Sequence, residues 1–141
     1  MSTYADTSFL VSLYLTDSHS AEAERRMRAR PDVWLTPFHV AEWTHAVEQH
    51  VFRKLISRIE ADRLQECFQQ HRESGLWVES PLPESAFDVC SQLARQYGAR
   101  LGLRTLDTLH VSSALELKAQ RFWTFDERQQ KLARAAGLKA A

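Results

Sequence analysis

Four acidic residues stand where carboxylates could carry out chemistry together. Asp6 follows a short apolar stretch, Glu42 lies early in a predicted helix, Asp107 lies in the first turn of another, and Asp126 follows the β-rich residues 121–124. Taken singly, each has a structural explanation: a helix cap, a first-turn acid favoured by the helix dipole, or a partly exposed helix residue. In one cleft, however, two such charges about 6 Å apart would repel by roughly 3 kcal/mol at an effective dielectric constant of about 20. Protonation or a bound cation would relieve that repulsion.

The residue types point to a particular cation. A ligand set made only of oxygen atoms suits Mg²⁺ or Mn²⁺ and does not suit zinc. One such ion, or two, can activate a water molecule and stabilise the leaving oxygen when a phosphodiester bond is cut. The spacing of His39, Glu42 and His45 invites a zinc interpretation, but the two histidines lie about 240° apart around a helix. Both therefore could not easily face one ion together with Glu42.

Short apolar strands alternating with helices would position these acids. Strands are predicted over residues 2–6, 33–35, 76–78 and 121–124, and helices over 7–15, 18–30, 37–51, 57–75, 83–97, 105–118 and 127–136. Thr36 before Pro37, and Thr105, are predicted caps, Gly98 is a predicted stop, and Phe87 and Leu106 are predicted to face inward. This alternation favours a single α/β domain over residues 1–141, with a mostly parallel sheet of four or five strands. In such sheets the functional crevice lies at the carboxyl ends of the strands, where Asp6 and Asp126 stand.

Composition and charge limit the classes of function that the chain could have. The 18 basic and 18 acidic residues give a formal net charge of zero, so a nucleic acid would have to meet a local basic patch. None of the four glycines forms a phosphate-binding loop. No apolar run has membrane-spanning length, and no secretion signal is present. Two isolated cysteines fit a reducing compartment, and we expect a cytoplasmic protein without membrane contact.

Four motifs in sequence order carry a resemblance to a known family. They are Tyr4-Ala-Asp6-Thr-Ser8, Thr36-Pro-Phe-His-Val-Ala-Glu42, Leu103-Arg-Thr-Leu-Asp107-Thr-Leu-His-Val-Ser-Ser-Ala114 and Trp123-Thr-Phe-Asp126. Together they cover nearly the whole chain, and the chain resembles the PIN-domain ribonucleases. It is most similar to the VapC-type toxins of bacterial toxin–antitoxin pairs.

The resemblance implies a three-layer PIN-like fold and an endoribonuclease that depends on Mg²⁺ or Mn²⁺. By the resemblance, the metal ligands would be Asp6, Glu42, Asp107 and Asp126. The hydroxyls of Thr124 and Ser8 would orient the site. A homodimer, an RNA substrate and a small antitoxin that covers the cleft are also implied. The family commonly ends in a further strand, which here would have to form within the few residues after Gly137.

Several alternatives remain open. His110 lies one turn after Asp107 and could reach the cleft as a general acid, although a packed or solvated histidine is the simpler explanation. Arg104 could contact phosphate or only solvent. The chain could also be a PIN-like module that only binds a protein partner. A phosphotransferase with Asp6 as nucleophile is a further alternative, but such sites usually carry a second acid where this chain has Ser8.

Overall fold

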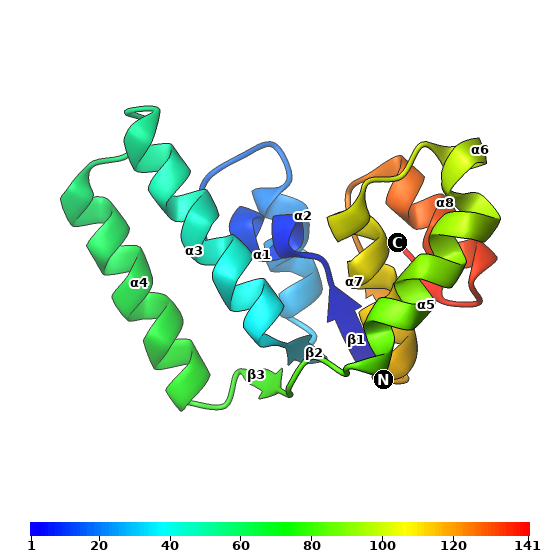
Figure 1. Cartoon of the computed structure of the whole chain (residues 1–141). Coiled ribbons are helices and arrows are strands. Elements are labelled where there is room, and N and C mark those ends of the chain that lie inside the picture. The colour runs from blue at the N-terminus through cyan, green and yellow to red at the C-terminus, as the bar shows by residue number, and fades with distance from the viewer.

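The computed structural model describes all 141 residues and contains one five-stranded parallel sheet between two groups of helices (Figure 1). The sheet order is β3-β2-β1-β4-β5, and every neighbouring pair is parallel. The strands are β1 (Ser2–Ala5), β2 (Asp32–Leu35), β3 (Trp77–Glu79), β4 (Arg121–Trp123) and β5 (Lys139–Ala140). The predicted α/β class is therefore confirmed, and the fifth strand forms as a two-residue strand that pairs with β4.

Helices connect the strands and cover both faces of the sheet. They are α1 (Thr7–Tyr14), α2 (Ser20–Met27), α3 (Pro37–Phe52), α4 (Arg58–Glu73), α5 (Ser85–Leu93), α6 (Ala99–Leu101), α7 (Thr105–Glu116) and α8 (Glu127–Ala135). A π-helical turn, Ala94–Gly98, joins α5 to α6. No helix combines the length and apolar character that a membrane span requires.

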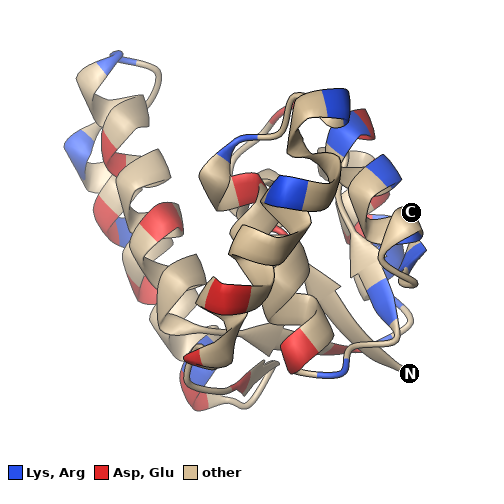
Figure 2. Cartoon of the chain, turned by 45° about the vertical axis from the view of Figure 1, so that its right-hand side comes forward, with Lys and Arg blue, Asp and Glu red and all other residues tan.

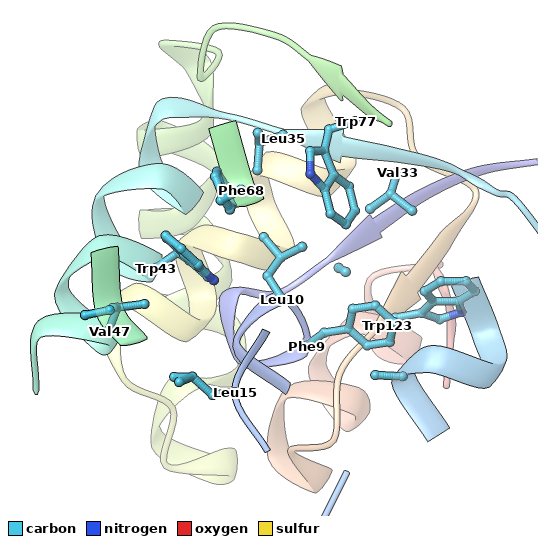
Figure 3. Close-up of a cluster of buried hydrophobic side chains, with 13 residues drawn as sticks. Phe9, Leu10, Leu15, Val33, Leu35, Trp43, Val47, Phe68, Trp77 and Trp123 are labelled. Atoms are coloured by element: carbon cyan, nitrogen blue, oxygen red, sulfur yellow. The ribbon is translucent and has the colours of Figure 1, made fainter. Parts of the chain in front are cut away.

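Alternating strand residues build a separate core on each face. Ala5, Val33, Leu35 and Trp123 point to the α1–α4 side, where Trp43 of α3 is fully buried (Figure 3). The intervening residues Tyr4 and Phe122 point to the other side, where they pack with residues of α7 and α8. Because successive side chains of a strand face opposite ways, β1 and β4 each contribute to both cores. The result is the predicted three-layer arrangement.

Two helix ends differ from the predictions. Gly98 does not stop the helix, because the chain continues through the π turn into α6 and ends at Gly102, whose φ of +65° lies in the left-handed region. Thr105 is the first helical residue of α7 and not its cap. The cap position belongs to Arg104, whose side chain makes no capping hydrogen bond. Asp107 nevertheless lies in the first turn of α7, as predicted.

Two apolar residues predicted to face inward are exposed. Phe87 on α5 is 55% exposed and Leu106 on α7 is 51% exposed. Helical spacing alone misplaced them, since α5 and α7 bury other sides against each other and the sheet. Seven consecutive residues of α7, from Thr108 to Ala114, are buried, so this helix is held on several sides. It therefore fixes the position of Asp107 firmly relative to the sheet.

Candidate functional site

The N-terminal ends of four helices meet at the carboxyl edge of the sheet and carry the four predicted acids there. Asp6 caps α1 directly after β1, and its N–H donates to the carbonyl of Trp123 at the end of β4. Asp126 caps α8 just after β4. Asp107 lies in the first turn of α7, and Glu42 lies in the second turn of α3, after β2. Each helix dipole favours a negative charge at this edge.

Asp6 is a buried carboxylate held by several donors. Its side chain is only 6% exposed and accepts hydrogen bonds from the Ser8 hydroxyl (2.8 Å to each oxygen), the Phe9 N–H (3.0 Å) and the Thr124 hydroxyl (3.0 Å). Burial raises the pKa of Asp6, although nearby His110 and these donors act against the rise. The orientation of Asp6 is thus set by the protein itself.

Thr124 connects Asp6 to Asp126. While its hydroxyl donates to Asp6, the same oxygen accepts the backbone N–H of Asp126 at 3.1 Å. One oxygen of Asp126 accepts the N–H of Gln129 at 2.9 Å, and the Gln129 side chain donates to the backbone carbonyl of Asp107 at 3.1 Å. Three of the four acids therefore belong to one hydrogen-bonded frame.

Glu42 is held by residues on two other elements. Its Oε1 atom accepts the hydroxyl of Thr7 at 2.6 Å and Nε2 of His110 at 2.5 Å. Because an ionised carboxylate can only accept, Nε2 of His110 carries the proton. The other ring nitrogen, Nδ1, bonds the hydroxyl of Tyr4 at 2.7 Å, and Phe38 stacks on the ring. Partial burial opposes ionisation of Glu42, but the hydrogen bond and charge of His110 and the bond from Thr7 outweigh it, so the pKa of Glu42 is lowered.

Asp107 and Asp126 face a polar cavity of about 200 Å³. Two guanidinium groups line the same cavity, those of Arg104 and Arg128. Arg104 donates from Nε to Asp107 at 3.0 Å, whereas Arg128 makes only a long contact, 3.5 Å, to the carbonyl of Gly102. Carboxylates and guanidinium groups thus share one opening, which suits a cation together with a phosphate.

The structure consequently divides the acids into two halves. Asp6 and Glu42 form the held half, because donors from other elements fix them, and Asp107 and Asp126 form the cavity half, because they line the polar cavity. Thr124 and Gln129 join the frame, yet no group of three or more His, Cys, Asp or Glu side chains lies close enough to hold an ion as the side chains now stand. The candidate ligands are nevertheless all carboxylates, and two of them, Asp107 and Asp126, line a polar cavity. This is the chemistry that Mg²⁺ accepts, and Mg²⁺ keeps several waters instead of needing a complete protein cage.

Some residues of the site were not predicted from the sequence. Thr7 and Tyr4 were not singled out, and Arg128 was not connected with the cavity that it lines. His110 is packed, as the simpler explanation had it, yet it also contacts Glu42. His39 belongs to the fold and not to a zinc site, because it caps α3 through Thr36 and bonds the carbonyl of Ala5 at 2.8 Å. The only advance signals were their positions in the sequence. Thr7 directly follows Asp6, and Arg128 comes two residues after Asp126.

Comparison with solved structures supports the fold strongly at low sequence identity. FitAcB from Neisseria gonorrhoeae superposes with a TM-score of 0.73 at 18% identity, covering 98% of this chain and 95% of that one. VapC20 from Mycobacterium tuberculosis, described as a sarcin–ricin loop cleaving toxin, gives 0.69 at 17% identity over 96% and 95%. VapBC2 from Rickettsia felis, solved bound to a promoter DNA fragment, gives 0.67 at 14% identity over 100% and 98%. At these identities the likeness establishes the fold alone.

Sequence comparison gives the family. No curated protein matches the chain in sequence. The sequence model of the PIN domain, however, matches residues 3–135, which is nearly the whole chain. The chain therefore belongs to the PIN domain family.

Proposed function

We propose that this protein is a metal-dependent endoribonuclease and the toxin of a toxin–antitoxin pair. PIN domains are typically metal-dependent nucleases, and its structural neighbours include VapC and FitB toxins. VapC20 is described as cleaving the sarcin–ricin loop, which is RNA. We extend that reaction class, but not that target, to this chain.

One observation carries the proposal: Thr124 joins Asp6 and Asp126 through a single hydroxyl. By donating to the Asp6 carboxylate and accepting the backbone N–H of Asp126, this hydroxyl ties the first acid to the backbone position of the fourth. Asp6 and Asp126 also cap their helices, but burial raises the pKa of Asp6, so its carboxylate is held in the charged form at a cost. A buried carboxylate of raised pKa, tied to acids that line a cavity, is typical of a functional site.

The proposed metal ligands are Asp6, Glu42, Asp107 and Asp126, with Mg²⁺ or Mn²⁺ as the ion. When bound, the ion supplies an activated water and neutralises charge on the phosphate. The protein's own contribution is orientation. Ser8 and Thr124 fix Asp6, while Thr7 and His110 hold one oxygen of Glu42 and leave the other without a hydrogen-bond partner in the protein.

The cavity residues would act on the substrate. Arg104 and Arg128 stand beside Asp107 and Asp126, so a phosphodiester entering the cavity would meet both cations. Arg104 would exchange its contact with Asp107 for the phosphate when a metal binds Asp107. Forked contacts from guanidinium to phosphate fit this exchange.

Cleavage of RNA tests the proposal. Wild-type protein incubated with total bacterial RNA and Mg²⁺ or Mn²⁺ should cut it, and EDTA should stop the reaction. Asp6→Asn and Asp107→Asn should each lower the rate at least about 100-fold, because each removes charge from the metal site, and that factor corresponds to about 3 kcal/mol. Asp88→Asn is the matched control, since Asp88 lies exposed on α5 away from the cavity. Undiminished cleavage in both site variants would contradict the assignment.

The proposed partners are an antitoxin and a second copy of the chain. Several structural neighbours are complexes with FitA or VapB. The product of a short neighbouring reading frame should copurify with this protein and block RNA cleavage. Sedimentation of the purified toxin should give the mass of a dimer.

A non-catalytic binding module is the second candidate. The observation in its favour is that no three metal-binding side chains lie close enough to hold an ion. Under this alternative, Mn²⁺ would not raise the melting temperature, and no RNA would be cut. An increase in melting temperature with Mn²⁺ that Asp107→Asn abolishes would exclude it.

A further inference from the structure

Charge is distributed unevenly along the chain although the total is zero. Residues 1–93 contain 14 acidic and nine basic residues, a net charge of −5, whereas residues 94–141 contain four acidic and nine basic residues, a net charge of +5. Figure 2 shows the second group as blue segments gathered on the α6 and α8 side, away from the α3–α4 hairpin. An anionic polymer would therefore be attracted to one side of the molecule.

The basic residues on the two sides also differ in their partners. Four arginines of the first part, namely Arg25, Arg26, Arg58 and Arg72, form ion pairs with acids. In the second part only Arg104 forms one, with Asp107. The remaining cations there have no carboxylate partner within the chain. They are thus available to an anion from outside.

Three of these free cations follow one another along α8. Arg128, Lys131 and Arg134 are exposed and lie three residues apart, so they form an oblique row whose first and last members are about 9 Å apart along the helix axis and about 120° apart around it. Arg128 also lines the cavity that contains Asp107 and Asp126. Arg134 donates only to the carbonyl of Ala140. We call these three residues the α8 basic strip.

We propose that the RNA backbone runs from the acidic cavity along the α8 basic strip. This inference rests on the proposed function and adds the path of the substrate. Arg128 contacts the phosphate at the cavity, and Lys131 and Arg134 contact phosphates farther along the strand. Such contacts position a strand without reading its sequence. The α3–α4 hairpin lies outside the path because its six acids outnumber its five cations, so it offers the backbone no net positive charge.

Binding measured without cleavage tests the path. The probe is a single-stranded polyuridine of about 12 nucleotides, a length within the usual range of single-strand sites. Fluorescence anisotropy in EDTA, over a series of salt concentrations, gives both the affinity and its salt dependence. The test variant is R128Q/K131Q/R134Q. The matched control is R53Q/K54Q/R63Q, which removes three exposed cations around the α3–α4 hairpin and changes the net charge equally.

If each strip cation neutralises one phosphate, the test variant should bind about 100-fold more weakly at 0.1 M salt, with a salt slope shallower by about 2. The control should bind as wild type does. Equal loss in both variants would overturn the path, because RNA would then respond only to net charge. Unchanged binding in the test variant would also overturn it, provided that melting curves show both variants folded.

Two further outcomes separate this inference from its alternatives. Polyglutamate of similar length should bind at least tenfold more weakly than polyuridine, and equal binding would mean that the strip serves an acidic polypeptide instead. If the wild-type protein cuts RNA and the test variant still binds polyuridine normally, the proposed path is wrong and the nuclease proposal stands. Conversely, loss of binding in the test variant, without any cleavage by wild type, would refute the nuclease and leave the path standing.

Discussion

Asp6 and Asp126 are connected through the single hydroxyl of Thr124, yet their surroundings are opposite. Asp6 is almost fully buried and accepts bonds from Ser8, Phe9 and Thr124. Asp126 is exposed and, beyond its cap to Gln129, faces a polar cavity. Glu42 resembles Asp6 in being held by donors from other elements, whereas Asp107 resembles Asp126 in facing the cavity.

The two pairs of acids therefore have different roles within one site. In the held half, Asp6 and Glu42, the fold itself fixes the carboxylates, so a substitution there should change the stability of the protein. In the cavity half, Asp107 and Asp126, the carboxylates share a polar cavity with arginines, so a substitution should change metal and RNA binding with little change in stability. The predictions below test this division.

Removing the imidazole of His110 should have the largest effect on stability. His110→Ala leaves Glu42 without one donor and Tyr4 without its partner in a buried setting, which should lower the free energy of unfolding by about 2–3 kcal/mol. His110→Gln can still donate to Glu42 and should recover about 1 kcal/mol of this. Urea denaturation measures both. Equal losses would show that His110 serves packing and not the orientation of Glu42.

His39, which packs against Tyr4 and His110, should make stability depend on pH. Burial and the nearby charge of His110 lower the pKa of His39 to about 3, despite its bond to Ala5. In the unfolded chain the pKa of His39 is near the ordinary 6.5, so His39 binds a proton at a pH at which it stays neutral in the folded protein. The contribution of neutral His39 is therefore complete above about pH 6.5 and is lost progressively toward pH 3.

Between pH 7 and pH 5 this loss should amount to about 2 kcal/mol. His39→Gln should flatten that part of the pH profile in urea denaturation. His45→Gln is the control, since His45 is exposed and bonds only the carbonyl of Ala41. A wild-type profile that His39→Gln leaves unaltered would contradict the burial of a neutral His39.

Asp6→Asn should stabilise the protein at neutral pH in EDTA. Burial raises the pKa of Asp6, so the charged carboxylate is less stable in the fold than in water. Asparagine keeps an oxygen for the Phe9 N–H and so preserves the cap. Thermal melts measure the shift. A clear loss of stability would indicate that the donors around Asp6 more than offset its burial.

Arg104→Gln should have the smallest effect on stability. The Arg104 side chain is 82% exposed, and such an ion pair with Asp107 contributes less than about 0.5 kcal/mol. RNA binding should nevertheless weaken, because Arg104 lines the cavity. A stability loss comparable with that of His110→Ala would remove the distinction between the two halves.

Short-range sequence signals predicted where the acids lie, whereas contacts between residues far apart in the sequence determine what surrounds them. The caps at Asp6, Thr36 and Asp126 could be predicted because a cap is formed with residues only two or three positions away. The donors to Glu42 could not, since Thr7 and His110 are 35 and 68 positions away along the chain. Gly98 misled the prediction because its helical φ gives no stop, and the π turn carries the chain on to Gly102.

Titration of Mn²⁺ into the purified protein by calorimetry tests the central claim most directly, namely that the two halves form one metal site. The wild type should bind Mn²⁺, and Asp6→Asn and Asp107→Asn should each weaken binding at least tenfold, with Asp88→Asn unchanged. Absence of Mn²⁺ binding by the wild type would contradict the claim. So would an Asp107→Asn variant that binds as tightly as the wild type, since the cavity half would then take no part in the site.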